Sequence, residues 1–278
     1  MSTDPFRHLK AVVFDWAGTM VDHGSQAPMG VFVEVFGRFG VPVTIEEARG
    51  PMGLPKLEHI KALGALPRIA AAWREAQGGA FDDAAAQRVY EVFVPANRDV
   101  VARYADLIPG AAATATALRQ RGLKIGSTTG YTREIMAPLL PLAAEQGYAP
   151  DCLVCAGDLP AGRPTPLMMY KCFLDLAVWP ASAVVKVDDT APGIVEATAA
   201  GSWAVGVAMT GNAVGLSEAE LATRDPVEQF LLRAAATRTL EGAGAHSVID
   251  GVADLMPVMD EIESRLARGE RPPQPSGS

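Results

Sequence analysis

No apolar run in the sequence approaches the roughly 20 residues that a membrane-spanning helix requires. The first eight residues also lack the apolar stretch of a signal peptide. Basic residues are fewer than acidic ones: the sequence has 24 Lys and Arg and 32 Asp and Glu, which gives a net charge of −8. This balance argues against a surface that binds nucleic acid or an anionic membrane. Only three cysteines are present (Cys152, Cys155 and Cys172), so they cannot all pair. These absences predict a cytoplasmic protein with reduced thiols that binds neither nucleic acid nor membrane.

Hydrophobic residues, in contrast, make up 49% of the 278 positions, enough for one large domain or for a core with an inserted cap. Short apolar runs rich in Val and Ile, without strict polar alternation, are typical of strands covered on both faces. They alternate with helical patterns, which indicates an α/β fold with a doubly wound parallel sheet. The predicted strands are 10–15, 123–130, 152–155, 184–189 and 203–207, and the helices between them are 111–121, 133–146, 167–176 and about 194–200.

The interval between the first two strands is far longer than a strand–helix–strand unit needs. Nearly all of it is helix-forming, so we expect an all-helical cap domain, residues 24–104, inserted into a Rossmann-like core domain of residues 1–23 and 105–278. The apolar helix around 31–39 could face the cap interior or a subunit interface. The Pro- and Ser-rich tail after Leu266 is expected to be frayed. The predicted cap helices are 29–39, 45–49, 54–63, 69–77 and 82–104.

Ligands of doubly wound sheets bind beyond the carboxyl ends of the strands, so the residues that follow each strand are candidates for function. Carboxylates are ligands for Mg²⁺, whereas hydroxyls, backbone amides and a guanidinium suit phosphoryl oxygens. Each acid alone could simply cap the next helix, but four strand ends with this chemistry favour a site where a divalent cation such as Mg²⁺ holds a phosphoryl group. The residues after the first to the fourth strand are Asp15; Thr128, Thr129 and Gly130; Arg163; and Asp188 and Asp189.

The segment VVFDWAGTMVD, residues 12–22, resembles the first motif of the haloacid dehalogenase superfamily: a strand, a nucleophilic Asp and a Thr four residues later. Residues 127–129 and 188–189 resemble two further motifs, and the position of the cap resembles the helical-cap class. A carboxylate beside Mg²⁺, here Asp15, can attack phosphorus in line and form an aspartyl phosphate that water later opens. Thr129 and Arg163 would hold the phosphoryl oxygens.

Position 17 departs from the phosphatases of that superfamily, which carry a second Asp there as the general acid for an oxygen leaving group. The residue here is Ala17, and loss of the acid should slow alkoxide departure roughly 10²–10⁴-fold. An inactive copy could carry this change, but the remaining motifs are intact. We therefore expect a leaving group that is activated in another way.

Lys56, in the predicted cap, is a candidate for that activation. It follows the turn-forming Gly53 and Pro55, in a chain with six lysines and eighteen arginines. If the cap closes, Lys56 could face Asp15 and condense with an aldehyde, and a protonated imine is an electron sink that lets carbon leave phosphorus. From the residues alone, a surface lysine on a cap helix is the more common arrangement.

Five segments together are similar to the phosphonoacetaldehyde hydrolase (phosphonatase) family over nearly the whole chain: FDWAGTMVDHG, RGPMGLPKLEHI, KIGSTTGYTREIM, PAGRPTPLMMY and KVDDTAPGI. This resemblance implies that Lys56 forms a Schiff base with phosphonoacetaldehyde and that Asp15 accepts the phosphoryl group. The implied products are acetaldehyde and phosphate, in the degradation of 2-aminoethylphosphonate. It also implies a homodimer joined through the cap, and Mg²⁺ bound by Asp15, the backbone carbonyl of Ala17, and Asp189.

The same resemblance gives a set of substrate- and phosphate-binding residues. Those around the imine are carried over more loosely, and His59 could either relay protons or be a solvated helix residue. The set comprises Met52, His59 and Tyr131 near the imine, and Thr129, Gly130 and Arg163 at the phosphoryl group.

One position departs from this family. Relatives often carry a second acid four residues after the equivalent of Asp189, where Gly193 stands here, and Asp188 could compensate for it. Lys186 could be a second positive charge near the phosphate or a structural ion-pair partner.

Three alternatives remain open. A phosphomonoesterase or phosphomutase of the same superfamily would need a surrogate acid from the cap. A catalytically silent module would bind phosphate or metal without turnover. A dehalogenase would also lack the acid at position 17, but it should not depend on Mg²⁺.

Overall fold

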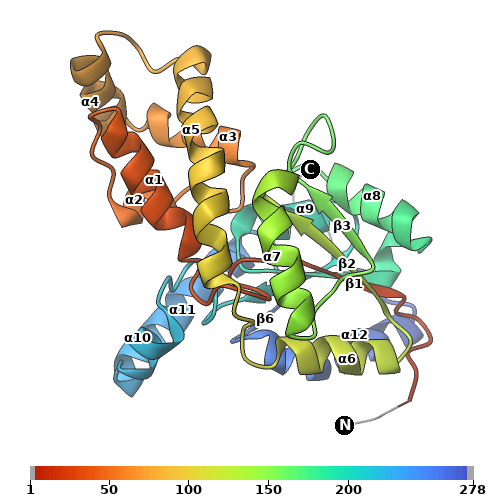
Figure 1. Ribbon diagram of the computed structural model, residues 1–278. Coiled ribbons are helices and arrows are strands. Elements are labelled where there is room, and N and C mark those ends of the chain that lie inside the picture. Colours follow the sequence, from red (N-terminus) through yellow and green to blue (C-terminus); the bar gives the residue numbers. More distant parts are fainter. Residues whose placement is uncertain (1–3, 274–278) are drawn as a thin grey trace.

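The computed structural model describes residues 4–273, which form a parallel six-stranded sheet with helices on both faces and a helical cap to one side (Figure 1). The strand order is β3-β2-β1-β4-β5-β6, so β1 lies between β2 and β4. Phe14 pairs with Ser127 on one side and with Val187 on the other, so Asp15 leaves the sheet between these two neighbours. The strands are β1 (Ala11–Phe14), β2 (Lys124–Thr129), β3 (Cys152–Cys155), β4 (Val184–Asp188), β5 (Trp203–Val207) and β6 (Ser247–Ile249).

The apolar run of β1 is buried on both faces of the sheet, as its lack of polar alternation predicts. Val12 and Phe14 pack into the core that includes α6, α7 and α12, whereas Ala11 and Val13 pack against α8 on the opposite face. The first layer is α6 (Ala111–Gln120), α7 (Arg133–Glu145) and α12 (Leu255–Ala267); the second is α8 (Leu167–Leu176), α9 (Ala191–Ala199) and α11 (Pro226–Gly242).

Five helices inserted between β1 and α6 form the cap (Figure 1). Its interior is aromatic: Phe32 of α1 stacks on Phe93 of α5 with ring centroids 4.3 Å apart. Val31 and Phe36 are also buried, so the apolar side of α1 is cap core and not an exposed interface. The helices are α1 (Ala27–Arg38), α2 (Ile45–Arg49), α3 (Lys56–Ala65), α4 (Pro67–Gln77) and α5 (Asp83–Val101).

Local signals set the ends of these cap helices. Thr44 and Glu47 form a reciprocal capping box at the start of α2, and Asp82 accepts a hydrogen bond from the Ala85 amide at the start of α5. Gly78 ends α4 in the left-handed conformation, with φ +73°. The two chain crossings between cap and core lie side by side, since Val21 pairs with Leu107 in an isolated bridge.

The doubly wound sheet and the inserted helical cap are confirmed, but the sequence patterns did not predict the last part of the core. Strand β6 has three residues and is half-buried, and α10 (Glu218–Ala222) has one turn, so neither carries a readable hydrophobic pattern. The expectation of a frayed tail is wrong up to residue 273: Arg271 donates to Ser182 Oγ at 2.9 Å, and the His246 ring lies 2.9 Å from the Pro273 carbonyl oxygen. Residues 274–278 of that tail lie outside the described residues.

Within residues 4–273, no helix combines the length and the hydrophobicity that crossing a membrane would require.

Candidate active site

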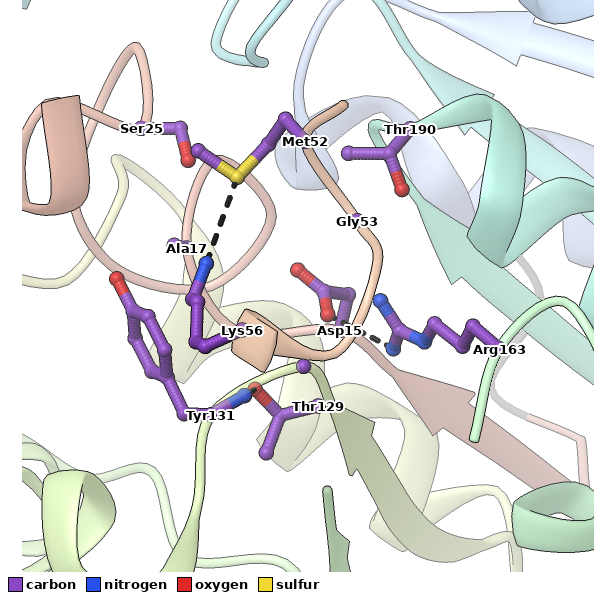
Figure 2. A pocket seen from close by; sticks show the side chains of 11 residues that line it. Asp15, Ala17, Ser25, Met52, Gly53, Lys56, Thr129, Tyr131, Arg163 and Thr190 are labelled. Carbon is purple, nitrogen blue, oxygen red and sulfur yellow. Dashed lines mark hydrogen bonds and ion pairs between the residues drawn. The ribbon is translucent and has the colours of Figure 1, made fainter. Parts of the chain in front are cut away.

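A small pocket lies between the cap and the carboxyl ends of the central strands (Figure 2). It brings together the end of β2, the start of α3 and residues from the loops that follow β1, β2, β3 and β4. Most of the predicted site residues are among those that line it: Asp15, Ala17, Ser25, Met52, Gly53, Lys56, Thr129, Gly130, Tyr131, Arg163 and Thr190.

Asp15 stands at the floor of this pocket, directly after β1. Its carboxylate lies 2.8 Å from Arg163 Nη2, and both side chains are almost fully buried. Burial and the nearby Asp188 carboxylate raise the pKa of Asp15 to about 6, against the lowering effect of Arg163.

Three buried acids form a cluster suited to a divalent cation. One carboxylate oxygen from each of Asp15, Asp188 and Asp189 lies within 4.8 Å of the others. Burial, followed by the charges of Asp15 and Asp188, raises the pKa of Asp189 well above its ordinary value. Carboxylates held this close repel one another, and a hard cation with oxygen ligands removes that repulsion, so these residues fit Mg²⁺.

Asp189 is oriented by two donors that the sequence did not identify as partners. Its Oδ2 accepts a hydrogen bond from the Asn212 backbone amide at 2.7 Å, and its Oδ1 accepts one from Thr19 Oγ1 at 3.3 Å. Gly18 approaches so closely that a Cβ there would lie 2.2 Å from Asp189 Oδ2.

Asp188 explains why position 193 is a glycine. A Cβ on Gly193 would lie 2.0 Å from the carboxyl carbon of Asp188, so the two side chains cannot share this space. The Asp188 carboxylate accepts hydrogen bonds from the Thr190 amide and hydroxyl. Burial alone would raise the pKa of Asp188, but Arg163 and Lys186 bring it below the ordinary range.

A buried ionic network lies beneath the pocket. Lys186 Nζ is 3.2 Å from Asp188 and 3.6 Å from Glu196, and it donates to Thr128 Oγ1 at 2.6 Å. Arg163 also pairs with Glu196, at 3.2 Å. Lys186 does not line the pocket, so its contacts favour the structural ion-pair interpretation. Glu196 belongs to no motif, and Thr128, although part of the second motif, was expected at the phosphoryl group and not in this network.

Lys56, the first residue of α3, points into the pocket and is only 3% exposed. The surface-lysine interpretation is therefore wrong. Its Nζ lies 3.8 Å from Met52 Sδ and 4.9 Å from the ring centroid of Tyr131 (Figure 2). The ring centroid of Phe32 is 5.7 Å from the same atom. Burial lowers the pKa of Lys56 to about 8, although Asp15 acts in the opposite direction.

Two hydroxyl groups near this amine have no hydrogen-bond partner among the described residues: Ser25 Oγ and the phenol of Tyr131. Both residues line the pocket. Ser25 has φ +52°, an uncommon conformation for a residue with a side chain. It lies in the cap hinge, and the sequence analysis did not identify it.

His59 is completely buried, so the interpretation as a solvated helix residue is wrong. Its Nε2 lies 2.8 Å from the Ala48 carbonyl oxygen, and its ring stacks on Phe32 with centroids 4.0 Å apart. Burial and the Lys56 charge hold the pKa of His59 well below its ordinary value. The ring is therefore neutral, and it packs behind Phe32 without lining the pocket.

The cap meets the core through a surface of glycines. A Cβ on Gly53 would lie 2.3 Å from Thr190 Oγ1, and one on Gly162 would lie 2.7 Å from Pro55 Cγ. A Cβ on Gly130 would lie 2.9 Å from the Leu54 carbonyl oxygen. The absence of these side chains lets residues 53–55 descend onto the core and bring Lys56 into the pocket.

Comparison with known proteins agrees with this site. A family model for haloacid dehalogenase-like hydrolases matches residues 9–201, so the chain belongs to that superfamily of hydrolases. The phosphonoacetaldehyde hydrolase of Paraburkholderia xenovorans is 57% identical over 266 residues, which cover 96% of this chain and 100% of the relative. That of Bordetella avium is 46% identical over 272 residues, covering 98% and 97%. Within the superfamily, the chain belongs to the phosphonoacetaldehyde hydrolase family.

A solved structure supports the same assignment. The crystal structure of a phosphonoacetaldehyde hydrolase-like protein from Oleispira antarctica matches with a TM-score of 0.94 and 43% identity, over 98% of this chain and 99% of that one. The resemblance stated from the sequence motifs is thereby confirmed.

Proposed function

We propose that this chain hydrolyses the carbon–phosphorus bond of phosphonoacetaldehyde to acetaldehyde and inorganic phosphate. The observation that carries the proposal is the buried amine of Lys56, which lines the same small pocket as Asp15 and Ala17. Relatives in the family bear the name of this reaction at up to 58% identity. We also propose that the reaction serves the degradation of 2-aminoethylphosphonate.

Lys56 begins the reaction. Its neutral amine attacks the aldehyde carbon, water leaves, and a protonated imine forms. A pKa of about 8 keeps a useful fraction of the amine neutral near pH 7. The side chains of Met52 and Tyr131 flank the amine and would enclose the imine.

Asp15 then takes the phosphoryl group. Its carboxylate oxygen bonds to phosphorus, the carbon–phosphorus bond breaks, and that electron pair moves into the imine to give an enamine. Water opens the aspartyl phosphate to release phosphate. The enamine carbon takes a proton, and a second water hydrolyses the imine to free acetaldehyde and Lys56. Because the leaving atom is carbon, no acid is needed at Ala17.

The phosphoryl oxygens need positive charge and donors. We propose that Arg163, Thr129 and the backbone at Gly130 hold them, since all three line the pocket. We further propose that Asp15, Asp189 and the carbonyl of Ala17 hold Mg²⁺, with Asp188 beside them. When bound, Mg²⁺ supplies positive charge that offsets repulsion between these carboxylates and the phosphoryl oxygens.

The phosphomonoesterase and phosphomutase alternatives need a surrogate acid from the cap, in place of the Asp that their relatives carry at the position of Ala17. The cap and hinge residues that line the pocket are Ser25, Met52, Gly53 and Lys56, and none carries a carboxyl group. This composition favours carbon–phosphorus cleavage over ester hydrolysis.

Product analysis tests the proposal. The purified protein with Mg²⁺ should release acetaldehyde and phosphate in equal amounts from phosphonoacetaldehyde. Lys56→Arg should abolish both products, whereas Lys61→Arg, at a more exposed cap lysine paired with Asp83, should not. Turnover of ordinary phosphate esters by the Lys56→Arg protein would favour the phosphomonoesterase instead.

Three further expectations stay proposals. We propose a cap of residues 24–104, because the chain crossings near both limits pair through Val21 and Leu107. We propose a homodimer joined through the cap, whose exposed apolar side chains include Ile45 and Leu66. We propose a cytoplasmic location, supported by three free cysteines.

A further inference from the structure

The cap has a second attachment to the core, through the Arg49 side chain at the end of α2. Its Nη1 donates to the Gly24 carbonyl oxygen at 2.8 Å and to Asn212 Oδ1 at 3.2 Å. Its Nη2 donates to the Gly215 carbonyl oxygen at 2.8 Å. One cap side chain thus bonds to both the hinge and a loop of the core.

The core loop is shaped to receive this guanidinium. Gly215 has φ +67°, and a Cβ there would lie 2.6 Å from Arg49 Cζ. Any side chain at position 215 would therefore displace Arg49. The Asn212 amide completes the contact by donating from Nδ2 to the Arg49 carbonyl oxygen at 3.4 Å.

The same loop holds an acid of the proposed metal cluster. The backbone amide of Asn212 donates to Asp189 Oδ2 at 2.7 Å. Gly211 packs so closely that a Cβ there would lie 2.6 Å from Asp189 Cβ. A continuous chain of contacts therefore runs from Arg49 in the cap through Asn212 to Asp189.

Arg49 also anchors the segment that crosses the pocket. Its carbonyl oxygen accepts a hydrogen bond from the Met52 amide at 3.1 Å. Lys56 follows seven residues after Arg49 in the sequence, beyond Gly53. If Arg49 leaves the core loop, the hydrogen bond from Asn212 Nδ2 to this carbonyl is lost as well, and the start of the segment is no longer tied to the core there.

We infer that Arg49 is a positioning residue that holds the cap closed over the pocket and, through Asn212, couples closure to cation binding at Asp189. The inference rests on the proposed function for the metal at Asp189 and for the role of Lys56. Coupling between two equilibria is reciprocal, so a cation that orders Asp189 and its loop favours closure, and closure favours the cation.

Chemical labelling of Lys56 tests this inference without substrate. Acetic anhydride acetylates exposed neutral amines, and mass spectrometry of peptides gives the rate at each lysine. In the wild-type protein, Mg²⁺ should slow acetylation of Lys56 about 5–150-fold relative to protein in EDTA, the usual span of such couplings. The exposed Lys171 should be unaffected by Mg²⁺.

Arg49→Ala should accelerate labelling of Lys56 and remove most of the Mg²⁺ effect. Arg49→Lys, which keeps the charge but cannot reach all three acceptors at once, should lie between. The matched control is Arg68→Ala, because among residues 4–273 Arg68 bonds to the cap alone, at Glu47 and the Pro42 carbonyl. In the Arg68→Ala protein, Lys56 should be acetylated at the wild-type rate and with the wild-type response to Mg²⁺.

Two further readouts separate positioning from a loss of folding. Arg49→Ala should raise the Kd for Mg²⁺, measured by calorimetry, and raise KM more than it lowers kcat, since saturating substrate restores closure. A merely destabilised protein would lower kcat at unchanged KM.

Two labelling results would overturn the inference. One is acetylation of Lys56 that is as slow and as Mg²⁺-sensitive in Arg49→Ala as in the wild type. The other is a wild-type acetylation rate of Lys56 that Mg²⁺ does not change. Neither outcome bears on product formation, which tests the proposed function separately.

Discussion

Burial favours the neutral form of both reacting side chains in the pocket. It lowers the pKa of Lys56 to about 8 and raises the pKa of Asp15 to about 6. Near pH 7 the Asp15 carboxyl group is therefore mostly ionised, while part of the Lys56 amine is neutral. That is the combination that an imine-forming nucleophile and a phosphoryl acceptor require.

The first residue-scale prediction concerns the pH dependence of imine formation. Because only neutral amine attacks an aldehyde, the rate of trapping at Lys56 should rise about tenfold per pH unit below pH 8 and level off above it. The rate is measured as borohydride-fixed adduct in the presence of Mg²⁺, where the cap is closed over Lys56. A rate that keeps rising to about pH 10 would indicate an ordinary lysine. Asp15→Asn removes a charge that raises this pKa, so its plateau should begin at lower pH.

A second prediction follows from the space shared by Asp188 and Gly193. Gly193→Asp should displace the Asp188 carboxylate and weaken Mg²⁺ binding roughly 10–100-fold, the usual cost of disturbing groups around a metal. The double variant Asp188→Gly/Gly193→Asp should recover part of the affinity, because a carboxylate then enters from the opposite side of the same space. Calorimetric titration with Mg²⁺ measures both, and wild-type affinity in Gly193→Asp would refute the shared-space explanation.

At the scale of elements, the segment between α2 and α3 decides whether the site is assembled. Residues 53–55 touch the core at Gly130, Gly162 and Thr190, and Lys56 begins the next helix. The pocket exists only while this segment rests on the core. Small residues on both sides make the contact close enough to bury Lys56.

We expect Gly53→Ala to destabilise the closed position of the cap on the core. The added Cβ would lie 2.3 Å from Thr190 Oγ1, and φ +93° is itself unfavourable for alanine. Overpacking of this kind costs about 1–3 kcal/mol, so KM for phosphonoacetaldehyde should rise on the order of tenfold or more. Gly37→Ala is the control, because a Cβ at this helical glycine meets nothing within 4 Å. Unchanged steady-state kinetics in Gly53→Ala would contradict this view of the closed cap.

At the scale of the whole molecule, the acid cluster ties stability to metal binding. Asp15, Asp188 and Asp189 are all buried in one place, and the raised pKa of Asp189 reflects both burial and repulsion. A cation that binds the folded chain alone stabilises it by mass action.

Mg²⁺ should therefore raise the melting temperature. At 100 times its Kd a ligand contributes about 2.7 kcal/mol, which for a chain of this size corresponds to a rise of roughly 5–10 °C. Differential scanning calorimetry with Mg²⁺ and with EDTA measures the shift. Asp189→Asn should abolish it, whereas Asp175→Asn, at a surface acid paired with Lys171, should keep it. The same Tm with and without Mg²⁺ in the wild type would argue against a metal at this cluster.

Much of this fold is readable from the sequence, because the central strands are continuous apolar runs and the cap is one long helical interruption. All five predicted strands are present, with small differences at their ends. The missed elements lack such signals: β6 has three residues, and α11 exposes Val227, Phe230 and Leu231 and so shows no clear apolar face. Tertiary packing, not local pattern, places them.

The site was predictable where strand ends deliver functional groups, as at Asp15 and Asp189. It was not predictable where a side chain acts through a distant contact. Glu196 and Asn212 lie on a helix and a loop without a motif, and only the folded chain brings them to Arg163 and Asp189. The steric conflict between a side chain at position 193 and the Asp188 carboxyl group likewise becomes visible only in the folded chain.

The most direct test of the account is reductive trapping of the substrate on the enzyme. Protein incubated with phosphonoacetaldehyde and borohydride should carry one adduct, and peptide mapping should place it on Lys56. Lys56→Arg should yield no adduct and lose activity on the order of 10³-fold or more, as loss of a nucleophile does. An active enzyme with no adduct at Lys56, or an adduct on another lysine, would contradict carbon–phosphorus cleavage through this amine.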